Sequence, residues 1–282
     1  MPIMNKIVKK ETLAEKIKLI EIEAPLIADK ALPGQFIVIR IDEKGERIPL
    51  TIADKDLKAG TITIVFQEAG ASTKVLGNLN AGDSILNLLG PLGQPTHIEK
   101  YGHVVVVGGG VGIAEIHPII KGMRDAGNKV TTIIGARCKE LLILDKMIAS
   151  VSDVVHVTTD DGSCGRKGFV SDVLKEMIEN GKPIDLVYAV GPVPMMEVVA
   201  GVTKGHNIKT LVSLNPIMLD ATGMCGVCRV VVGGKTMFAC VDGPEFDAHL
   251  VDFKDLRARL AMFKDEEKKA MELLDHECKL GK

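Results

Sequence analysis

The sequence predicts three structural parts: an N-terminal antiparallel β-barrel, a parallel-sheet α/β domain and a small C-terminal module that carries cysteines. Residues 1–100 contain short β-branched runs separated by turn residues, and residues 101–214 alternate buried strands with helix-length segments. Residues 215–251 are rich in Gly, Cys and Asp without long periodicity, and residues 252–282 have a charged, helical pattern. Short strands with frequent turns favour a barrel, whereas strand–helix alternation favours parallel βαβ units.

The composition is that of a globular chain of about two domains. Its 282 residues include 35 Lys and Arg against 37 Asp and Glu, a formal net charge of −2, which argues against nucleic acid or an anionic membrane as partner. No apolar run approaches the roughly 18 residues of a membrane span, and the start lacks the apolar core of a signal peptide. Six cysteines in such a chain point to thiols or metal ligands rather than disulfides. We therefore expect a cytoplasmic protein.

Within the barrel region, four runs are predicted as strands and one as a helix. The strands are 16–24, 35–40, 48–53 and 61–67, and the helix is 71–79. The turns between them contain Gly, which supplies positive φ, and Pro, which presets φ. An Arg at the start of RIPLT (47–51) and the helix-opening turn EAGAST (68–73) together suit a diphosphate. Taken alone, both are ordinary turns; the motifs that follow favour the diphosphate.

The α/β region carries glycine turns at the ends of its predicted strands, which are 103–108, 129–136, 154–159, 185–191 and 208–214. The turns are GGGVGIA (108–114), GAR (135–137), TDDGSCG (159–165) and VGPVPMM (190–196). One such turn is an ordinary helix cap. Four at the carboxyl edge of one parallel sheet predict a nucleotide cleft, with backbone N–H groups of the first loop near a pyrophosphate. The strand 129–136 ends without an acidic residue for a ribose hydroxyl, so it does not distinguish NAD from NADP.

The cysteine spacing is the most specific signal in the chain. Cys225 and Cys228 are separated by two residues, and Cys240 follows after eleven more. Plant-type 2Fe–2S sites place a first ligand before such a pair with four residues in between, and that position is Asp220. A structural zinc site or three free thiols are the alternatives; the long spacing and the lack of a nearby His disfavour zinc. We therefore expect a 2Fe–2S cluster held by Asp220 and the three cysteines, since oxygen ligation of iron is chemically allowed.

Glycines support this cluster prediction. Gly223 and Gly226 flank the first thiol and let the backbone approach the cluster closely. The stretch RVVVGGKTMFAC resembles a hairpin with Gly233-Gly234 as its turn, which would return Cys240 to the other ligands.

The order of barrel, nucleotide domain and 2Fe–2S motif resembles the ferredoxin–NADP reductase superfamily, in its electron-transfer-subunit branch. The resemblance extends from PGQF (33–36) to MCGVC (224–228). Two families in that branch are similar: the electron-transfer subunit of dihydroorotate dehydrogenase, and the small subunit of NADH-dependent ferredoxin:NADP oxidoreductase, also described as sulfide dehydrogenase. The Asp at the first ligand position and the extension ACVDGPEFDAHLVDF are closer to the second. Glu115 departs from the Pro that many relatives have after the glycine loop.

The resemblance implies cofactor sites on the matching motifs. FAD would be held by Arg47, Pro49, Leu50, Thr51, Gly70, Ala71, Ser72 and Thr73. The pyridine nucleotide, NAD(H), would be held by Gly109, Gly110, Val111, Gly112, Arg137, Asp160, Asp161, Gly162, Gly191, Pro192 and Met195. No catalytic side chain beyond the cofactors is expected, because cofactors carry hydride and electron transfer.

The function implied is an electron-transfer subunit that passes electrons between NAD(H), FAD and a 2Fe–2S cluster. The recipient would be a larger partner with its own flavin and 4Fe–4S centres, in a heterodimer or higher assembly that bifurcates electrons between ferredoxin and NADP. The alternative is the electron-transfer subunit of an NAD-dependent dihydroorotate dehydrogenase. A redox-sensing regulator is a third reading, which the near-neutral charge and the lack of a DNA-reading helix disfavour.

Overall fold

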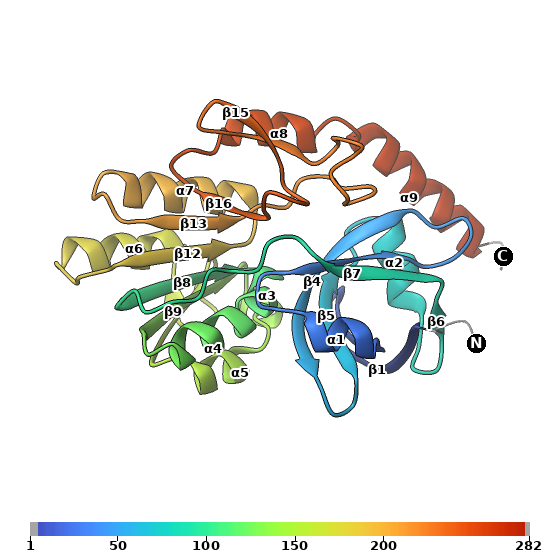
Figure 1. Ribbon diagram of the computed structural model, residues 1–282, viewed down its shortest axis with the longest axis horizontal. Coiled ribbons are helices and arrows are strands. Elements are labelled where there is room, and N and C mark those ends of the chain that lie inside the picture. The colour runs from blue at the N-terminus through green and yellow to red at the C-terminus, as the bar shows by residue number, and fades with distance from the viewer. Residues whose placement is uncertain (1–4, 280–282) are drawn as a thin grey trace.

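The computed structural model describes residues 5–279 of the chain and contains a barrel, an α/β domain and a C-terminal module. Figure 1 shows the barrel and the α/β domain side by side, with the C-terminal module and its helices above them. The three predicted parts and their order along the chain are confirmed.

The barrel is a seven-stranded antiparallel sheet. Its strands are β1 (Asn5–Ala14), β2 (Ile17–Glu23), β3 (Phe36–Arg40), β4 (Arg47–Asp56), β5 (Thr61–Gln67), β6 (Ser84–Ile85) and β7 (Asn87–Leu92), in the order β6-β1-β2-β5-β4-β3-β7. Only Leu86 separates the two edge strands, β6 and β7, so the sheet is nearly closed on itself. Alternating isoleucines on β2, β3 and β5 point inward and fill the barrel core.

Two short helices lie on the barrel. The predicted helix at 71–79 is present as α2 (Ala71–Asn78). A second helix, α1 (Pro25–Lys30), was not predicted; it begins at Pro25, whose fixed φ suits the first turn of a helix. The prediction of a single helix in this region is therefore wrong.

The α/β domain is a second seven-stranded sheet. Its strands are β8 (His103–Gly109), β9 (Lys129–Ala136), β10 (Val154–Thr159), β11 (Arg166–Lys167), β12 (Leu186–Val190), β13 (Thr210–Ser213) and β16 (Glu245–Asp247), in the order β11-β10-β9-β8-β12-β13-β16. All pairs are parallel except β13 with β16. The chain crosses from one side of β8 to the other before β12. A topological switch point therefore lies between β8 and β12, where ligands bind in such sheets.

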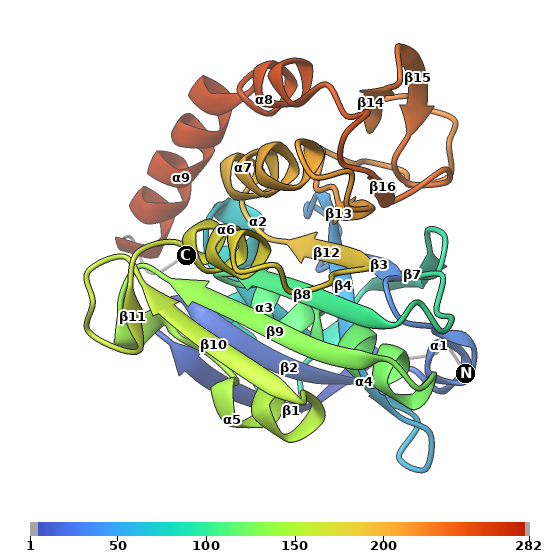
Figure 2. The ribbon, with the colours of Figure 1, turned by 90° about the vertical axis from the view of Figure 1, so that its left-hand side faces the viewer.

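Helices cover both faces of this sheet, as Figure 2 shows. One face carries α3 (Gly112–Glu115), α4 (His117–Asp125) and α5 (Asp145–Val151), and the other carries α6 (Val170–Glu179) and α7 (Val193–Lys204). A short 3₁₀ turn spans Lys139–Leu141. Barrel residues Leu19 and Val65 join the core on the α3–α4 face, whereas Phe253 and Leu256 of the C-terminal module join the core on the other. Both faces of the sheet therefore pack against other parts of the chain.

The C-terminal module contains the predicted hairpin and two helices. The hairpin consists of β14 (Arg229–Val232) and β15 (Lys235–Phe238), and its turn residues Gly233 and Gly234 both have positive φ, at 58° and 75°. Such a turn matches the twist of the paired strands. The helical tail is divided into α8 (Phe253–Leu260) and α9 (Lys264–Lys279), and α9 contacts α2 of the barrel. No helix in the described part of the chain is long and apolar enough to span a bilayer.

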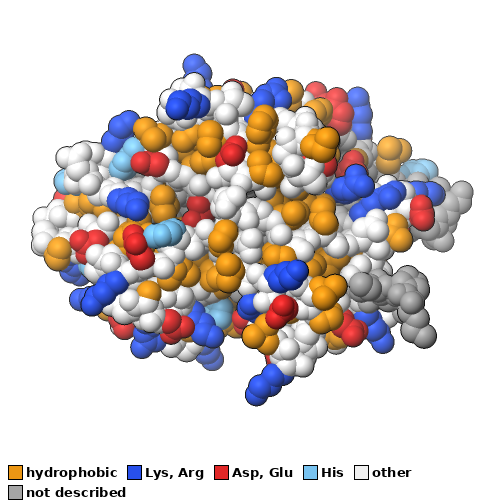
Figure 3. Space-filling model, in the orientation of Figure 1, with side chains coloured by type: hydrophobic (Ala, Val, Ile, Leu, Met, Phe, Trp, Pro, Cys, Tyr) orange, Lys and Arg blue, Asp and Glu red, His pale blue; other side chains and the backbone are white. Residues whose placement is uncertain are grey.

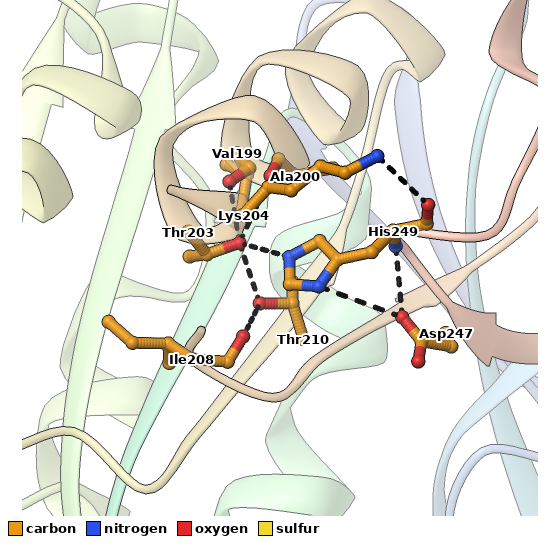
Figure 4. Close-up of polar contacts among 8 residues, drawn as sticks. All are labelled: Val199, Ala200, Thr203, Lys204, Ile208, Thr210, Asp247 and His249. Carbon is orange, nitrogen blue, oxygen red and sulfur yellow. Dashed lines mark hydrogen bonds and ion pairs between the residues drawn. The ribbon is translucent and has the colours of Figure 1, made fainter. Parts of the chain in front are cut away.

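A polar network attaches the end of the module to the α/β domain (Figure 4). The Nε2 atom of His249 lies 2.9 Å from the Thr203 hydroxyl on α7, and the Thr210 hydroxyl on β13 donates to that same oxygen at 2.7 Å. Asp247 accepts the backbone N–H of His249 at 2.9 Å. Because Thr203 and Thr210 are fully buried, these hydrogen bonds satisfy hydroxyls that water does not reach.

A largely buried carboxyl joins all three parts. Glu245 on β16 accepts a hydrogen bond from the Tyr188 hydroxyl on β12 at 2.5 Å and another from Thr96, which lies between the barrel and the α/β domain. Burial raises the pKa of Glu245 above its ordinary value. A side chain on Gly34 would collide with Thr96 and Glu245, and the φ of Gly34 is +84°, so the position suits only glycine.

Candidate functional site

Two adjoining cavities lie at the carboxyl edge of the parallel sheet. The sheet-edge cavity, of about 610 Å³, lies over the ends of β9 and β10 and the start of α7; its wall includes Arg137, Asp160 and Met195. The interdomain cavity, of about 430 Å³, lies between the barrel and the ends of β8, β12 and β13; its wall includes Thr51 and Glu115. The residues that border both cavities are Gln67, Gly109, Gly110, Val111 and Pro192. The cavities therefore meet at the glycine loop.

Close packing explains the glycines of that loop. A Cβ on Gly112 would lie 2.5 Å from the carbonyl oxygen of Val190, and one on Gly109 would lie 2.4 Å from the Met195 sulfur. Gly110 has a φ of +57°, and its N–H donates to the carbonyl of Gly135 at 3.0 Å. The loop can therefore bring its backbone to both cavities only without side chains.

The sheet-edge cavity collects most of the residues predicted for NAD(H). Seven of the eleven line it: Gly109, Gly110, Val111, Arg137, Asp160, Pro192 and Met195. Gly112 and Gly191 line the interdomain cavity instead. Asp161 and Gly162 are on neither wall. Asp161 accepts the Ser163 hydroxyl at 2.7 Å, a bond that lowers the pKa of its carboxyl, and Ser163 in turn accepts the backbone N–H of Lys139, so this turn braces the neighbouring loop.

The interdomain cavity collects half of the residues predicted for FAD. Pro49, Leu50 and Thr51 of β4 and Thr73 of α2 are on its wall. Arg47, Gly70, Ala71 and Ser72 are not, and Arg47 is exposed. Thr73 lies 3.0 Å from both the N–H and the carbonyl oxygen of Gly70, which holds the start of α2 in place. The Ser72 hydroxyl donates to Glu46 at 3.3 Å.

Glu115 is an acidic side chain on an otherwise uncharged wall. The Thr51 hydroxyl donates to its Oε2 atom at 3.0 Å, which joins α3 of the α/β domain to β4 of the barrel. Burial raises the pKa of Glu115, although the Thr51 hydrogen bond acts in the opposite direction. A group in this position favours its protonated form more than an exposed glutamate does.

The four residues predicted as cluster ligands form two close pairs. The Cys225 thiol and the Asp220 carboxyl are 3.2 Å apart, and the sulfurs of Cys228 and Cys240 are also 3.2 Å apart. Cys225 is exposed, whereas Cys228 and Cys240 are buried. Burial and the adjacent Cys228 raise the pKa of Cys240 to about 12, whereas hydrogen bonds from Thr222 and Cys225 lower the pKa of Asp220.

This pairing suits a two-iron cluster better than a single ion. Among residues 5–279, no three His, Cys, Asp or Glu side chains converge tightly enough to hold one metal ion. In a 2Fe–2S cluster, each iron takes two protein ligands and shares the bridging sulfides. Two separate pairs are the arrangement that such a cluster requires.

Several cavity residues were not predicted from the sequence. In the interdomain cavity they include Phe36, Gln67, Asn215 and Met218, and in the sheet-edge cavity they include Phe169 and Val198. Asn215 directly follows the predicted strand 208–214, so the rule that ligands bind at strand carboxyl ends would have found it. The others come from different elements and converge only in the fold.

Comparisons with known proteins agree with this geometry. Residues 106–201 match the oxidoreductase NAD-binding domain family, and residues 215–252 match the iron–sulfur cluster binding domain of dihydroorotate dehydrogenase B. A homolog of the dihydroorotate dehydrogenase B (NAD(+)) electron transfer subunit from Thermotoga maritima is 48% identical, covering 94% of this chain and 93% of the relative. The electron transfer subunit of Geobacillus thermodenitrificans is 30% identical, covering 86% and 95%.

A solved structure is also closely similar. It comes from work on flavin-based electron bifurcation in NADH-dependent reduced ferredoxin-NADP oxidoreductase. It is 45% identical, with a TM-score of 0.92, and the match covers 96% of this chain and 98% of that one. The resemblance seen in the motifs is thereby confirmed along nearly the whole chain. This chain belongs to the family of dihydroorotate dehydrogenase B-like electron-transfer subunits, and it is an oxidoreductase subunit with an NAD-binding domain and an iron–sulfur cluster binding domain.

Proposed function

We propose that this chain passes electrons between NAD(H), FAD and a 2Fe–2S cluster and delivers them to a larger partner subunit that carries its own flavin and 4Fe–4S centres. The assembly would be an NADH-dependent reduced ferredoxin:NADP oxidoreductase. The observation that carries the proposal is the pair of cavities that meet at the glycine loop, one over the NAD-binding sheet and one against the barrel. The similarity to the bifurcating oxidoreductase structure supports the identity of the assembly.

Each cavity has walls suited to a different ligand. The sheet-edge cavity would take the nicotinamide nucleotide, with Arg137 and Asp160 as polar contacts and the glycine loop beside the pyrophosphate. The interdomain cavity would take the flavin ring against Pro49, Leu50 and Thr51. Six of the predicted residues are on neither wall and would contact the cofactors from outside the two cavities: Arg47, Gly70, Ala71, Ser72, Asp161 and Gly162. When bound, the flavin supplies the conversion between a hydride and single electrons.

The cluster would be held by the two ligand pairs. Asp220 and Cys225 would bind one iron, and Cys228 and Cys240 the other. The β14–β15 hairpin holds the second pair together, because Cys228 immediately precedes β14 and the N–H of Ala239, beside Cys240, donates to the Cys228 carbonyl at 3.2 Å.

The proposal is tested by an anaerobic NADH titration of the purified chain, followed by absorbance and EPR together. We expect bound flavin that bleaches with NADH and a reduced 2Fe–2S signal. A chain with neither flavin nor iron would contradict the proposal as a whole. Bound flavin that responds to NADPH but not to NADH would contradict the NADH assignment alone.

The second candidate function, delivery of electrons from dihydroorotate oxidation to NAD, is supported by the subunits of that name at 30% identity. Isolation of the native complex separates the two candidates. We expect a large partner with cysteine-rich, ferredoxin-like segments. A barrel-type flavoprotein that oxidises dihydroorotate would favour the alternative.

A further inference from the structure

The interdomain cavity has a single titratable side chain on its wall. Of the described residues that line it, Glu115 alone has an acidic or basic side chain; the others are apolar residues, glycines, amides and hydroxyls. The cavity therefore has one carboxyl that could accept a proton.

Glu115 is hydrogen-bonded to the hydroxyl of Thr51, a second residue of the same cavity wall. Thr51 donates to Oε2 of Glu115 at 3.0 Å, and both residues are on the cavity wall. A hydroxyl can accept one proton while it donates another, so Thr51 can relay a proton between the cavity and the carboxyl. Burial raises the pKa of Glu115, and this makes proton uptake by the carboxyl easier.

No charged partner competes for the carboxyl. The elements packed against α3 are β4, β8, α4 and β12, and their titratable or charged groups are Arg47, Asp54, Lys55 and Asp56, then His103, then His117, Lys121, Arg124 and Asp125, and finally Tyr188. In the described structure none of them hydrogen-bonds or ion-pairs with Glu115. Burial and the carboxyls of Glu245 and Glu115 raise the pKa of Tyr188, so that phenol stays neutral.

The proposed function, on which this inference rests, creates a need for such a group. Oxidation of NADH to NAD⁺ releases two electrons and one proton, and the hydride carries all three into the cavity together. An iron–sulfur cluster accepts the electrons singly and takes no proton. One proton per hydride therefore stays behind in the cavity and must be accepted there.

We infer that the Glu115 carboxylate receives this proton through the Thr51 hydroxyl and so acts on the cavity by way of Thr51. The carboxylate gains the hydrogen that Thr51 donates, Thr51 takes the new proton from the cavity, and the carboxylic acid later releases its proton to water. In the opposite direction the same two groups return the proton, so mass and charge balance in both directions.

The test compares Glu115→Gln with Glu245→Gln, both reconstituted with FAD and cluster. Glutamine keeps an oxygen that accepts the Thr51 hydroxyl but cannot be protonated. Glu245 is a matched control, since it too is largely buried with a raised pKa but is not on the wall of the cavity. Redox-difference infrared spectra in water and D₂O report carboxylic acid groups directly.

We expect a D₂O-sensitive carboxylic acid band that changes on reduction, is lost in Glu115→Gln and persists in Glu245→Gln. In stopped flow, reoxidation by a one-electron acceptor should slow by about 10²- to 10⁴-fold in Glu115→Gln, a larger effect than the substitution has on bleaching by NADH. Glu115→Asp, which retains an ionisable carboxyl, should restore the band and part of the rate.

An infrared band and a reoxidation rate that are the same in Glu115→Gln and in the unsubstituted protein would overturn the inference while leaving the proposed function intact. A flavin-loaded wild-type chain that bleaches with neither NADH nor NADPH would instead refute the proposed function. If Glu115→Gln loses flavin, Glu115→Asp decides, because absence of the band in a flavin-loaded Asp variant also overturns the inference.

Discussion

At the scale of single residues, the fold pairs the predicted cluster ligands and packs a glycine of the nucleotide loop against a neighbouring backbone. Asp220 and Cys225 form one pair and Cys228 and Cys240 the other, although nineteen residues separate the outermost of the four, Asp220 and Cys240. The spacing predicts the ligand set, and the fold brings its four members together as two pairs. At the same scale, Gly112 is close to the Val190 backbone, where any side chain would collide.

Replacement of Asp220 should change the cluster more than the fold. Asp220→Cys supplies the softer ligand that most such clusters use, so we expect the cluster to assemble with a different midpoint potential and EPR signal. Asp220→Ala should lower iron content, since one iron loses a ligand. Iron analysis, EPR and redox titration check both variants. Unchanged spectra and midpoint in Asp220→Ala would show that Asp220 does not bind iron.

Replacement of Gly112 should damage the glycine loop. In Gly112→Ala the new methyl group meets a backbone carbonyl at 2.5 Å, so the loop must shift, and we expect a loss of about 1–3 kcal/mol in the free energy of unfolding. Affinity for nucleotide should fall as well. Gly201→Ala is the control: a Cβ there meets nothing within 4 Å in helix α7, and stability should stay equal or rise. Equal effects of the two substitutions on urea unfolding would contradict the argument.

At the scale of elements, β16 decides where the iron–sulfur module lies. This three-residue strand adds to the parallel sheet in the opposite direction, next to β13, and the His249 network holds the chain just beyond it. The module is therefore attached to the same sheet whose strand ends form the cavities. Its cysteines and the nucleotide cleft share one rigid support.

Loss of the His249 side chain should weaken that attachment. His249→Ala leaves the buried Thr203 hydroxyl with one partner fewer, and we expect a loss of about 1 kcal/mol in the free energy of unfolding. Faster hydrogen exchange in β16 and α8 should accompany it. His206→Ala, an exposed histidine of the same domain, is the control and should be neutral. Unfolding and exchange that match those of the control would show that the network contributes nothing.

Some strands and helices could be predicted from the sequence, and others could not. The five parallel strands and α2 were predicted because their apolar runs are bounded by glycine turns. Strand β1 was missed since its lysines and glutamates face water and only the residues at its start are buried, which hides the alternation. β16 is too short to show any period. Glu115 and Met218 reach one cavity from distant segments, and no local pattern encodes that convergence.

Across the whole molecule, the three parts share buried groups rather than connecting through loops alone. Phe36 and Val38 of the barrel belong to the same apolar core as Val105 of the sheet and Phe253 of the module. Glu245 binds Tyr188 and Thr96 at the same junction. The barrel, sheet and module should therefore unfold together.

This junction makes global stability depend on pH. The folded-state pKa values of Glu115 and Glu245 are raised, so the folded state binds more protons than the unfolded state. Their contribution is fully present below the ordinary glutamate pKa and is lost as pH rises through the folded-state values. We expect Glu245→Gln to gain stability relative to the unsubstituted chain as pH increases. Urea unfolding at several pH values measures this, and parallel curves would contradict it.

The antiparallel strand β16 has one more consequence. Strand β13 would otherwise be the edge of the large sheet, with unpaired N–H and carbonyl groups open to any passing chain. By covering that edge, the segment that matches the iron–sulfur cluster binding domain also prevents intermolecular β-pairing. We expect a chain shortened before Glu245 to keep all four predicted ligands and yet to aggregate, because the edge of β13 would then be uncovered.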